Sequence, residues 1–361
     1  MTGLYIHIPF CRQKCLYCDF FSRKYDVLLA DKYIDSLIKH SQKFKNKKID
    51  SIYIGGGTPS VLSSKQIQKL LQSLKNNFNF PEIKEFTFEL NPESVSKEKL
   101  HILKEFGIDR LSIGLQSVED KSLKYLGRIH DFKTFCCAYD MAKHEGFDNI
   151  SIDLIYGLTN QSVGDWENVL KKALLFNNDH LSLYPLSIEK NTPFHKNGGI
   201  TDDKIQREMY EKTVDILERK GYVHYEISNW AKKNKEAFHN TNYWRNREYI
   251  GLGVGASGYL ERNRYKNIED IDKYMNFIEN NLDCAIENDY IDEKLYATET
   301  IILGLRLLSE GLSVNDFKSL QHKVILLECL KEKTLIQEEE KIKLSKEYVF
   351  VFNQIASKFI V

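Results

Sequence analysis

The sequence predicts an α/β protein in which six β/α units form an open, partial barrel, followed by a small and mostly helical C-terminal domain. Two observations lead to this prediction. Short apolar, β-branched runs alternate with longer stretches of helical period up to about residue 220, which is typical of β/α units around a parallel sheet. A Gly-rich and aromatic-rich stretch then ends the alternation. Because six units are visible, an open barrel is favoured over a closed barrel of eight units.

The six predicted strands share an apolar, β-branched composition. They lie near residues 3–8, 50–54, 84–90, 110–115, 149–155 and 180–186. The predicted helices fill the intervals and follow the last strand, at about 28–45, 64–77, 96–106, 131–146, 163–176 and 203–220. Ser63 precedes the second of these helices, as expected for a residue that caps a helix.

Three segments follow from this pattern. Residues 1–230 form the partial barrel, residues 231–290 form an extension with the runs HNTNYW and YIGLGVGASGY, and residues 291–361 form the C-terminal domain. Helices are expected there at 293–308, 314–320, 322–333 and 346–358, with a small hairpin around the charged turn from Gln337 to Lys341. A winged-helix type of domain and a plain helical bundle both fit this segment.

Composition excludes several classes of protein. The 361 residues suffice for about two domains. With 42% hydrophobic and 28% charged residues, the chain is neither disordered nor a disulfide-stapled mini-protein. The 51 basic and 51 acidic residues balance, so no nucleic-acid partner is expected. The sequence lacks a long uncharged apolar stretch and a signal peptide, so we expect a cytoplasmic protein without a transmembrane segment, for which any membrane contact is peripheral.

Three of the seven cysteines, Cys11, Cys15 and Cys18, follow the first predicted strand with the spacing C-x3-C-x2-C. A strand-to-helix loop can turn three thiolates inward, and three Cys ligands on a 4Fe–4S cluster leave one iron open to a small molecule. A zinc site completed by a distant residue such as His7 is an alternative, although the sequence contains no second pair of zinc ligands. Three buried structural cysteines are the remaining alternative.

This motif, with Tyr17 before its last cysteine and YIHIPFC and YCDF around it, resembles the radical S-adenosylmethionine (radical SAM) superfamily. Within it, the sequence is similar to the branch of the oxygen-independent coproporphyrinogen oxidases (HemN) and the heme chaperones (HemW). Further matches occur in family order along nearly the whole chain: Gly55-Gly56-Gly57-Thr58-Pro59, ELNPE at Glu89, Gln116, Arg128, DLIYGL at Asp153 and LGLR at 303–306. The resemblance implies a six-unit partial barrel with the cluster and SAM at the carboxyl edge of its strands.

The glycine run follows the second strand, where missing side chains let the backbone approach a ligand closely. A flexible turn is the alternative. The resemblance places Gly56, Gly57 and Thr58 against the amino group of SAM, and it makes Tyr5 a SAM-contacting tyrosine that would otherwise be taken for a core aromatic residue.

Polar residues at the ends of three predicted strands, Glu89, Gln116 and Asp153, are further candidates for the SAM site, because ligands of α/β sheets bind at the carboxyl ends of strands. Helix capping or a salt bridge in the barrel is the alternative for each of them. Arg128 is one of only two arginines between residues 24 and 206, and its planar guanidinium suits a carboxylate of SAM or of a substrate. A solvated surface arginine is the alternative.

Two departures from the oxidase pattern favour the heme-chaperone branch. The oxidases extend the motif by a fourth cysteine, and Phe20 stands at that position. They also carry an N-terminal extension that encloses the substrate, whereas here Tyr5 follows Met1 almost immediately. We therefore expect no lid of this kind.

Residues 239–244, HNTNYW, match the HNxxYW signature of the heme-chaperone branch. The segment lies outside the six β/α units and is expected to form a separate site. An imidazole is a suitable axial ligand of heme iron, so His239 is the predicted ligand, with Tyr243 and Trp244 against the macrocycle. A core or surface histidine is the alternative. No C-x-x-C-H run is present, so covalent heme attachment is not indicated.

The resemblance thus implies a heme chaperone that binds heme and transfers it to an acceptor protein, with a SAM-binding 4Fe–4S cluster and an electron donor as a further partner. The alternative function is an oxygen-independent coproporphyrinogen III oxidase that acts through a 5′-deoxyadenosyl radical. The sequence leaves open whether SAM is cleaved or only bound. A nucleic-acid-binding module based on the C-terminal domain is disfavoured, because the chain has no basic stripe.

Overall fold

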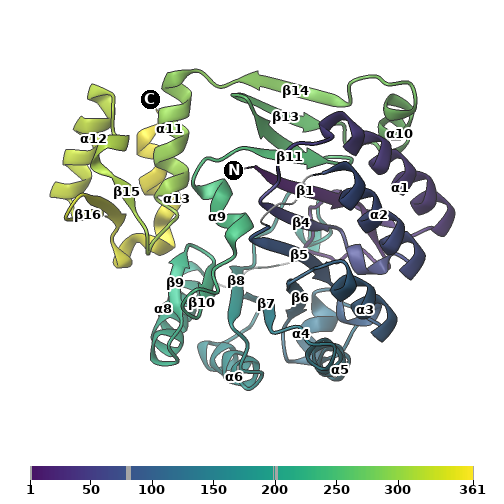
Figure 1. Ribbon diagram of the computed structural model, residues 1–361. Helices are drawn as coiled ribbons and strands as arrows, with labels where there is room; N and C mark the ends of the chain where they lie inside the picture. Colours follow the sequence, from purple (N-terminus) through teal and green to yellow (C-terminus); the bar gives the residue numbers. More distant parts are fainter. Residues whose placement is uncertain (1, 79–82, 198, 200–201, 361) are drawn as a thin grey trace.

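The computed structural model describes residues 2–78, 83–197, 199 and 202–360, and Figure 1 shows its ribbon. Twelve strands form one mixed sheet in the order β14-β13-β12-β11-β1-β4-β5-β6-β7-β8-β10-β9. Seven neighbouring strands, from β11 to β8 in this order, run parallel. The two end strands, β14 and β9, do not pair with each other over the described residues, so the barrel is open as predicted.

All six predicted strands are present, with ends within two residues of the prediction. They are β1 (Gly3–Ile8), β4 (Ser51–Gly56), β5 (Glu85–Leu90), β6 (Arg110–Gln116), β7 (Asn149–Tyr156) and β8 (His180–Pro185). The predicted helices are present too, as α1 (Val27–Ser41), α2 (Ser64–Asn77), α3 (Lys97–Glu105), α5 (Phe132–His144), α6 (Val163–Leu174) and α8 (Asp203–Arg219). Ser63 caps α2 in a capping box with Gln66.

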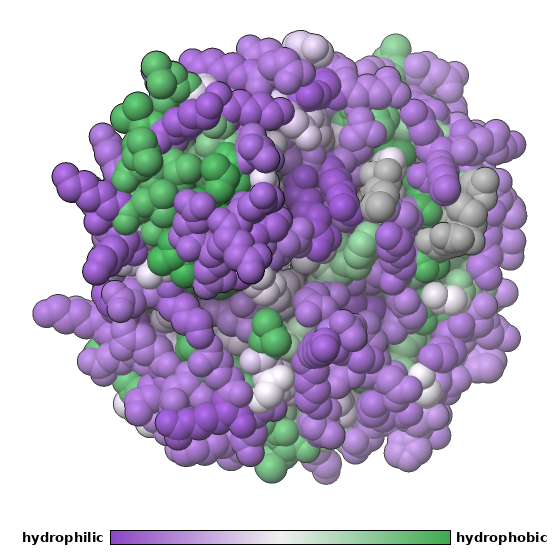
Figure 2. Space-filling view, turned by 60° about the vertical axis from the view of Figure 1, so that its left-hand side comes forward, coloured by the Kyte–Doolittle hydropathy of each residue, from purple (hydrophilic) through white to green (hydrophobic). Residues whose placement is uncertain are grey.

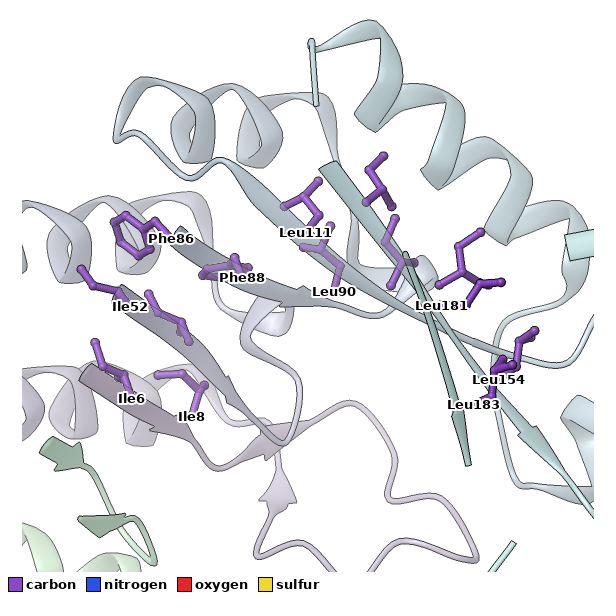
Figure 3. Packing of buried hydrophobic residues seen from close by; sticks show 14 of the residues in the cluster. Ile6, Ile8, Ile52, Phe86, Phe88, Leu90, Leu111, Leu154, Leu181 and Leu183 are labelled. Atoms are coloured by element: carbon purple, nitrogen blue, oxygen red, sulfur yellow. The ribbon is translucent and has the colours of Figure 1, made fainter. Parts of the chain in front are cut away.

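The side chains of the six strands alternate between two faces. Apolar residues such as Ile6, Ile52, Phe88 and Leu181 are buried between the sheet and the outer helices, as Figure 3 shows. The residues between them are polar or small and line the inside of the barrel, which we call the inner face. Its members include Tyr5, His7, Ser51, Tyr53, Thr87, Glu89, Arg110, Ser112, Asp153 and Ser182. Closed barrels fill this space with apolar side chains, so a polar inner face is suited to polar ligands.

The Gly-rich extension is part of the same sheet. Its strand β11 (Tyr249–Leu252) runs parallel to β1 with Leu4 opposite Ile250, a seventh parallel strand that the sequence analysis did not predict. Three antiparallel strands follow on that side, β12 (Ser257–Leu260), β13 (Asn263–Asn267) and β14 (Ala285–Tyr290). Two others, β9 (Val223–Glu226) and β10 (Asn229–Ala231), extend the sheet beyond β8. The boundaries at residues 230 and 290 remain predictions.

The C-terminal segment contains helices and a small sheet. The helices are α11 (Glu293–Gly304), α12 (Leu320–Lys331) and α13 (Phe352–Ala356). The strands β15 (Leu312–Ser313), β16 (Leu335–Glu338) and β17 (Lys341–Leu344) form an antiparallel sheet in the order β15-β17-β16. The predicted hairpin is therefore present as β16 and β17. This sheet fits the winged-helix type better than a plain helical bundle, and the C-terminal segment lies to one side of the barrel in Figure 1.

The face of the molecule in Figure 2 is mainly hydrophilic, with its largest group of hydrophobic residues at the upper left. Of the helices formed by the described residues, none combines the length and the apolar character that crossing a membrane requires.

Candidate functional site

The cysteine loop begins at the carboxyl end of β1. Cys11 ends the short strand β2 (Phe10–Cys11), which pairs with β3 (Arg23–Lys24), so the chain between them forms a closed loop. The Cys11 carbonyl accepts a hydrogen bond from the Tyr25 backbone amide at 2.8 Å. Further along, Leu16 is held by backbone hydrogen bonds to Leu126 and Phe194, both at 3.1 Å. The loop is thus fixed at its ends and in its middle.

All three cysteines of this loop are free thiols, and they lie near enough to influence one another's ionisation. Burial raises the pKa of the Cys11 thiol and raises that of Cys18 to about 11. The Thr58 hydroxyl donates to Cys11 Sγ at 3.4 Å, and Arg128 Nη1 donates to Cys15 Sγ at 3.5 Å. A hydroxyl donor and a guanidinium favour the thiolate forms that bind iron.

Over the described ranges, no three His, Cys, Asp or Glu side chains converge as the ligands of a single metal ion do. The thiolates of a 4Fe–4S cluster each bind a different iron and need no common point of convergence. Three thiols on one anchored loop, with two donors directed at them, therefore fit such a cluster.

The glycine turn after β4 lies directly against the cysteine loop. Gly57 N donates to Ile8 O at 2.9 Å, and Thr58 N donates to Phe10 O at 2.8 Å. A Cβ on Gly57 would lie 2.8 Å from Phe10 O and 3.0 Å from Cys11 Sγ, so no side chain fits there. Gly56 has a φ of +113°, a conformation that glycine adopts freely. The glycine turn thus packs directly against the cysteine loop and fixes its position.

Glu89 lies beside this turn at the end of β5. Its carboxylate accepts hydrogen bonds from the Tyr53 hydroxyl at 2.5 Å and from Gly56 N at 3.2 Å. Burial, together with the nearby charge of Asp153, raises the pKa of Glu89 to about 7. A carboxyl group at this position is suited to a ligand that brings a hydroxyl group or a positive charge.

Arg128 is the centre of a network that joins the cysteine loop to three strand ends. Its Nη2 donates to Asn91 Oδ1 at 2.7 Å and to Gly114 O at 3.0 Å. Asn91 in turn donates from Nδ2 to Thr58 Oγ1 at 2.8 Å. Asn91 is therefore the direct link between Thr58 and Arg128, although only the glutamate of the ELNPE run was a predicted site residue.

Gln116 occupies a strained position at the end of β6. Its φ is +69°, rare for a residue with a side chain, and the register of β6 shifts between Gly114 and Gln116. A Cβ on Gly114 would lie 2.9 Å from Gln116 Nε2 and 3.4 Å from Arg128 Nη2. The bulge thus turns the amide of Gln116 over Gly114 and towards Arg128, and strain of this kind is often found at binding sites.

Asp153 and Tyr5 belong to the inner face below these residues. The Asp153 carboxylate accepts hydrogen bonds from the hydroxyls of Ser112 and Ser151, and burial raises its pKa. The Tyr5 hydroxyl lies 2.9 Å from His7 Nδ1, and its ring lies beside that of Tyr53. The structure therefore brings all the predicted cluster and SAM residues to one end or to the inner face of the barrel.

His239 lies at the amino end of the barrel strands, opposite to the end that carries the cysteine loop. It belongs to α9 (Phe238–Trp244), and its side chain is 1% exposed. Nδ1 lies 3.0 Å from the hydroxyl of Ser51, the first residue of β4, and Nε2 lies 2.7 Å from the Tyr243 hydroxyl. A strand rises about 3.3 Å per residue, and β4 takes five such steps from Ser51 to Gly56. The amino end of the barrel is therefore separated from the cysteine loop by roughly 16 Å.

The HNTNYW segment is therefore packed against the amino end of the barrel, and that it forms a separate site remains a prediction. The first residues of α9 donate their backbone amides to Glu85, and burial lowers the pKa of His239 to about 3. The helix closes the amino end of the barrel because its polar groups pair with those of the inner face. Binding of heme iron at His239 remains a prediction, and it requires one of the two hydrogen bonds of the ring to break.

Replacing His239 with alanine is expected to lower the free energy of unfolding by about 2–4 kcal/mol, because it removes the hydrogen bonds of the ring to the Ser51 and Tyr243 hydroxyls and opens a cavity. Urea denaturation measures this, and the exposed His195→Ala serves as the control. A His239→Ala protein of normal stability that has lost its heme absorption band would instead identify the imidazole as the axial ligand.

Comparisons with known proteins relate the whole chain to one family. A family model of the radical SAM superfamily matches residues 5–173. The heme chaperone HemW of Lactococcus lactis subsp. lactis is 36% identical over 372 residues, covering 99% of this chain and 97% of that protein. The heme chaperone HemW of Bacillus subtilis is 33% identical over 377 residues, covering 100% of this chain and 99% of that protein.

Among solved structures, the coproporphyrinogen III oxidase HemN of Escherichia coli superimposes with a TM-score of 0.87. The match covers 99% of this chain and 89% of that chain, with 21% sequence identity. At this identity the likeness concerns the fold.

Proposed function

Because this chain belongs to the radical SAM superfamily and, within it, to the family of the heme chaperone HemW, we propose that it binds heme and transfers it to an acceptor protein. The observation that carries the proposal is the similarity to HemW proteins over the whole length of both chains. Membership in the superfamily implies a 4Fe–4S cluster and SAM. When bound, a cluster held by three thiolates offers one iron without a protein ligand to a small molecule.

In this proposal Cys11, Cys15 and Cys18 hold the cluster, and Arg128 and Thr58 stabilise two of the thiolates through the contacts described above. Gly56 and Gly57 leave backbone groups accessible to SAM. Several polar groups lie around that space and are proposed to hold SAM through its amino, carboxylate and hydroxyl groups: Tyr5, Thr58, Glu89, Gln116, Arg128 and Asp153.

The alternative function, coproporphyrinogen oxidation, has the support of the shared fold with HemN. Phe20 argues against it. Its side chain stands where the oxidases have a fourth cysteine, it is 64% exposed beside the cysteine loop, and it offers no thiol. The heme chaperone is therefore the proposed function.

Anaerobically purified protein, reconstituted with its cluster, tests this function in two measurements. Titration with heme is expected to give a saturable Soret band, and mixing the loaded protein with an apoglobin is expected to transfer heme. Incubation with coproporphyrinogen III, SAM and a reductant is expected to yield no protoporphyrinogen IX by mass spectrometry. Product in this assay would assign the protein to the oxidases, and absence of heme binding would refute the chaperone.

A second experiment addresses the SAM residues. Asp153→Ala is expected to weaken SAM binding about tenfold or more without loss of the cluster, because it removes a buried acceptor from the inner face. Calorimetry on cluster-loaded protein measures this, with Asp148→Ala as the control, since the Asp148 side chain is 87% exposed. Unaltered SAM affinity in both Asp153→Ala and Arg128→Ala would show that the assignment is wrong.

A further inference from the structure

A chain of hydrogen bonds joins two of the loop cysteines through Asn91. The Thr58 hydroxyl donates to Cys11 Sγ at 3.4 Å, and Asn91 Nδ2 donates to Thr58 Oγ1 at 2.8 Å. On the other side, Arg128 donates from Nη2 to Asn91 Oδ1 at 2.7 Å and from Nη1 to Cys15 Sγ at 3.5 Å. Asn91 therefore lies between the two groups that donate to the sulfurs.

The direction of each hydrogen bond in this chain follows from Arg128, because a guanidinium has donors and no acceptor. The oxygen of the Asn91 amide must face Arg128, which turns the NH2 group of the amide towards Thr58. The Thr58 oxygen accepts from that NH2 group, so its single proton is left for Cys11 Sγ. We call Arg128, Asn91 and Thr58 the donor chain.

The backbone of Asn91 is held independently of its side chain. Its N–H donates to Ser60 Oγ at 3.0 Å, and its carbonyl accepts from Ser94 Oγ at 2.9 Å. Lys99 Nζ donates to the carbonyls of Ser60 and Ser94 at 2.7 and 3.0 Å. A change of the Asn91 side chain is therefore expected to leave this turn in place, so substitution can isolate the effect of the amide.

Donors to cysteine sulfurs affect how readily an iron–sulfur cluster accepts an electron. Reduction makes the cluster and its thiolates more negative, and hydrogen bonds to the sulfurs stabilise the more negative state. The Thr58 side chain is buried, so bulk water cannot take over its hydrogen bond to Cys11. A buried donor chain that begins at a guanidinium should therefore raise the reduction potential.

We propose that Asn91 is a positioning residue that raises the reduction potential of the cluster. It does so by fixing the Thr58 hydroxyl as a donor to Cys11 and by orienting Arg128 towards Cys15. The inference rests on the proposed assignment of the cluster to the three loop cysteines. The step concerned is the transfer of one electron from an external reductant to the oxidised cluster, in which no bond forms or breaks and no proton moves.

A redox titration of anaerobically reconstituted protein tests this inference, with dithionite as the reductant and the paramagnetic signal as the measure of reduced cluster. SAM is left out, because Thr58 is a proposed SAM contact. Thr58→Val keeps the shape of the side chain and removes the donor. At a fixed potential it is expected to lower the ratio of reduced to oxidised cluster about tenfold, a shift of about 59 mV to more negative potentials. Thr58→Ser keeps the hydroxyl and is expected to have the wild-type potential.

Asn91→Leu removes the amide without adding a charge and is expected to lower the same ratio several-fold. The reason is that the Thr58 proton is no longer directed at Cys11 and that Arg128 loses one acceptor. The double variant with Thr58→Val is expected to shift the potential by less than the sum of the single shifts, because Asn91 acts on Cys11 through Thr58. Asn91→Ala takes the place of the leucine variant if that variant binds no iron.

Thr213→Val is the matched control. The Thr213 hydroxyl is also buried, but it donates to Met209 O and accepts from Trp166 Nε1, between α8 and α6. Its replacement is expected to leave the potential unchanged. Thermal unfolding and iron content show whether each variant folds and holds a cluster.

The outcomes separate this inference from the cluster assignment. If the anaerobic wild-type protein holds no 4Fe–4S cluster, the assignment fails and this inference fails with it. If the variants hold the cluster at the wild-type potential, the donor chain does not act on it and the assignment stands. Additive shifts in the double variant, or a shift in Thr58→Val that Asn91→Leu lacks, would show that Asn91 is not the positioning residue.

Discussion

Replacing any one of Cys11, Cys15 and Cys18 with alanine is expected to remove the 4Fe–4S cluster completely from the anaerobically purified protein. Two thiolates cannot replace three, and over the described residues no other cysteine lies on this loop. The broad visible absorption and the paramagnetic signal of the reduced cluster should both disappear, and iron analysis should show none bound.

The barrel is expected to remain folded in these variants, because the loop is held by backbone hydrogen bonds that no cysteine side chain makes. Circular dichroism and thermal unfolding check this. Cys136→Ala and Cys137→Ala, in α5, serve as controls and should keep the full cluster. Stoichiometric zinc without iron in anaerobic protein would end the cluster assignment.

Gly57→Ala is expected to have the second largest effect. Although all three cysteines remain, we expect this variant to lose most of its 4Fe–4S cluster. The added methyl group would lie 2.8 Å from Phe10 O and 3.0 Å from both Phe10 N and Cys11 Sγ. The cysteine loop must therefore move away from the glycine turn. Overpacking of this kind costs about 1–3 kcal/mol. Iron content and SAM affinity are both expected to fall.

Gly164→Ala is the control for this substitution. Gly164 lies in the first turn of α6, its nearest neighbour to an added Cβ is 3.9 Å away, and alanine favours a helix. This variant should keep its cluster and be at least as stable as the wild type. Normal cluster content in Gly57→Ala would show that the turn does not place the cysteine loop.

Most of the barrel could be predicted from the sequence, because its six strands and helices follow local periodicity. The strand β11 could not, since its four residues, YIGL, pair with β1 nearly 250 positions away and carry no β/α pattern of their own. The same applies to β9 and β10, which are too short for a periodic signal.

The candidate site, too, could be predicted only in part from the sequence. The cysteine spacing and the polar strand ends marked most of the residues that meet at the carboxyl edge. Asn91 was missed because its partners, Thr58 and Arg128, come from other units of the chain. His239 was recognised by its motif, but only the structure shows that Ser51 and Tyr243 occupy its two nitrogens.

The polar inner face also bears on how long a molecule of this protein survives in a cell. Polar groups that await a ligand contribute little to stability on their own, whereas a ligand at 100 times its Kd stabilises the folded state by about 2.7 kcal/mol. Molecules that have bound neither the iron–sulfur cluster nor SAM therefore unfold locally more often, and proteases degrade such molecules first. The amount of this protein in a cell should consequently follow the supply of iron, sulfide and SAM, even at a constant rate of synthesis.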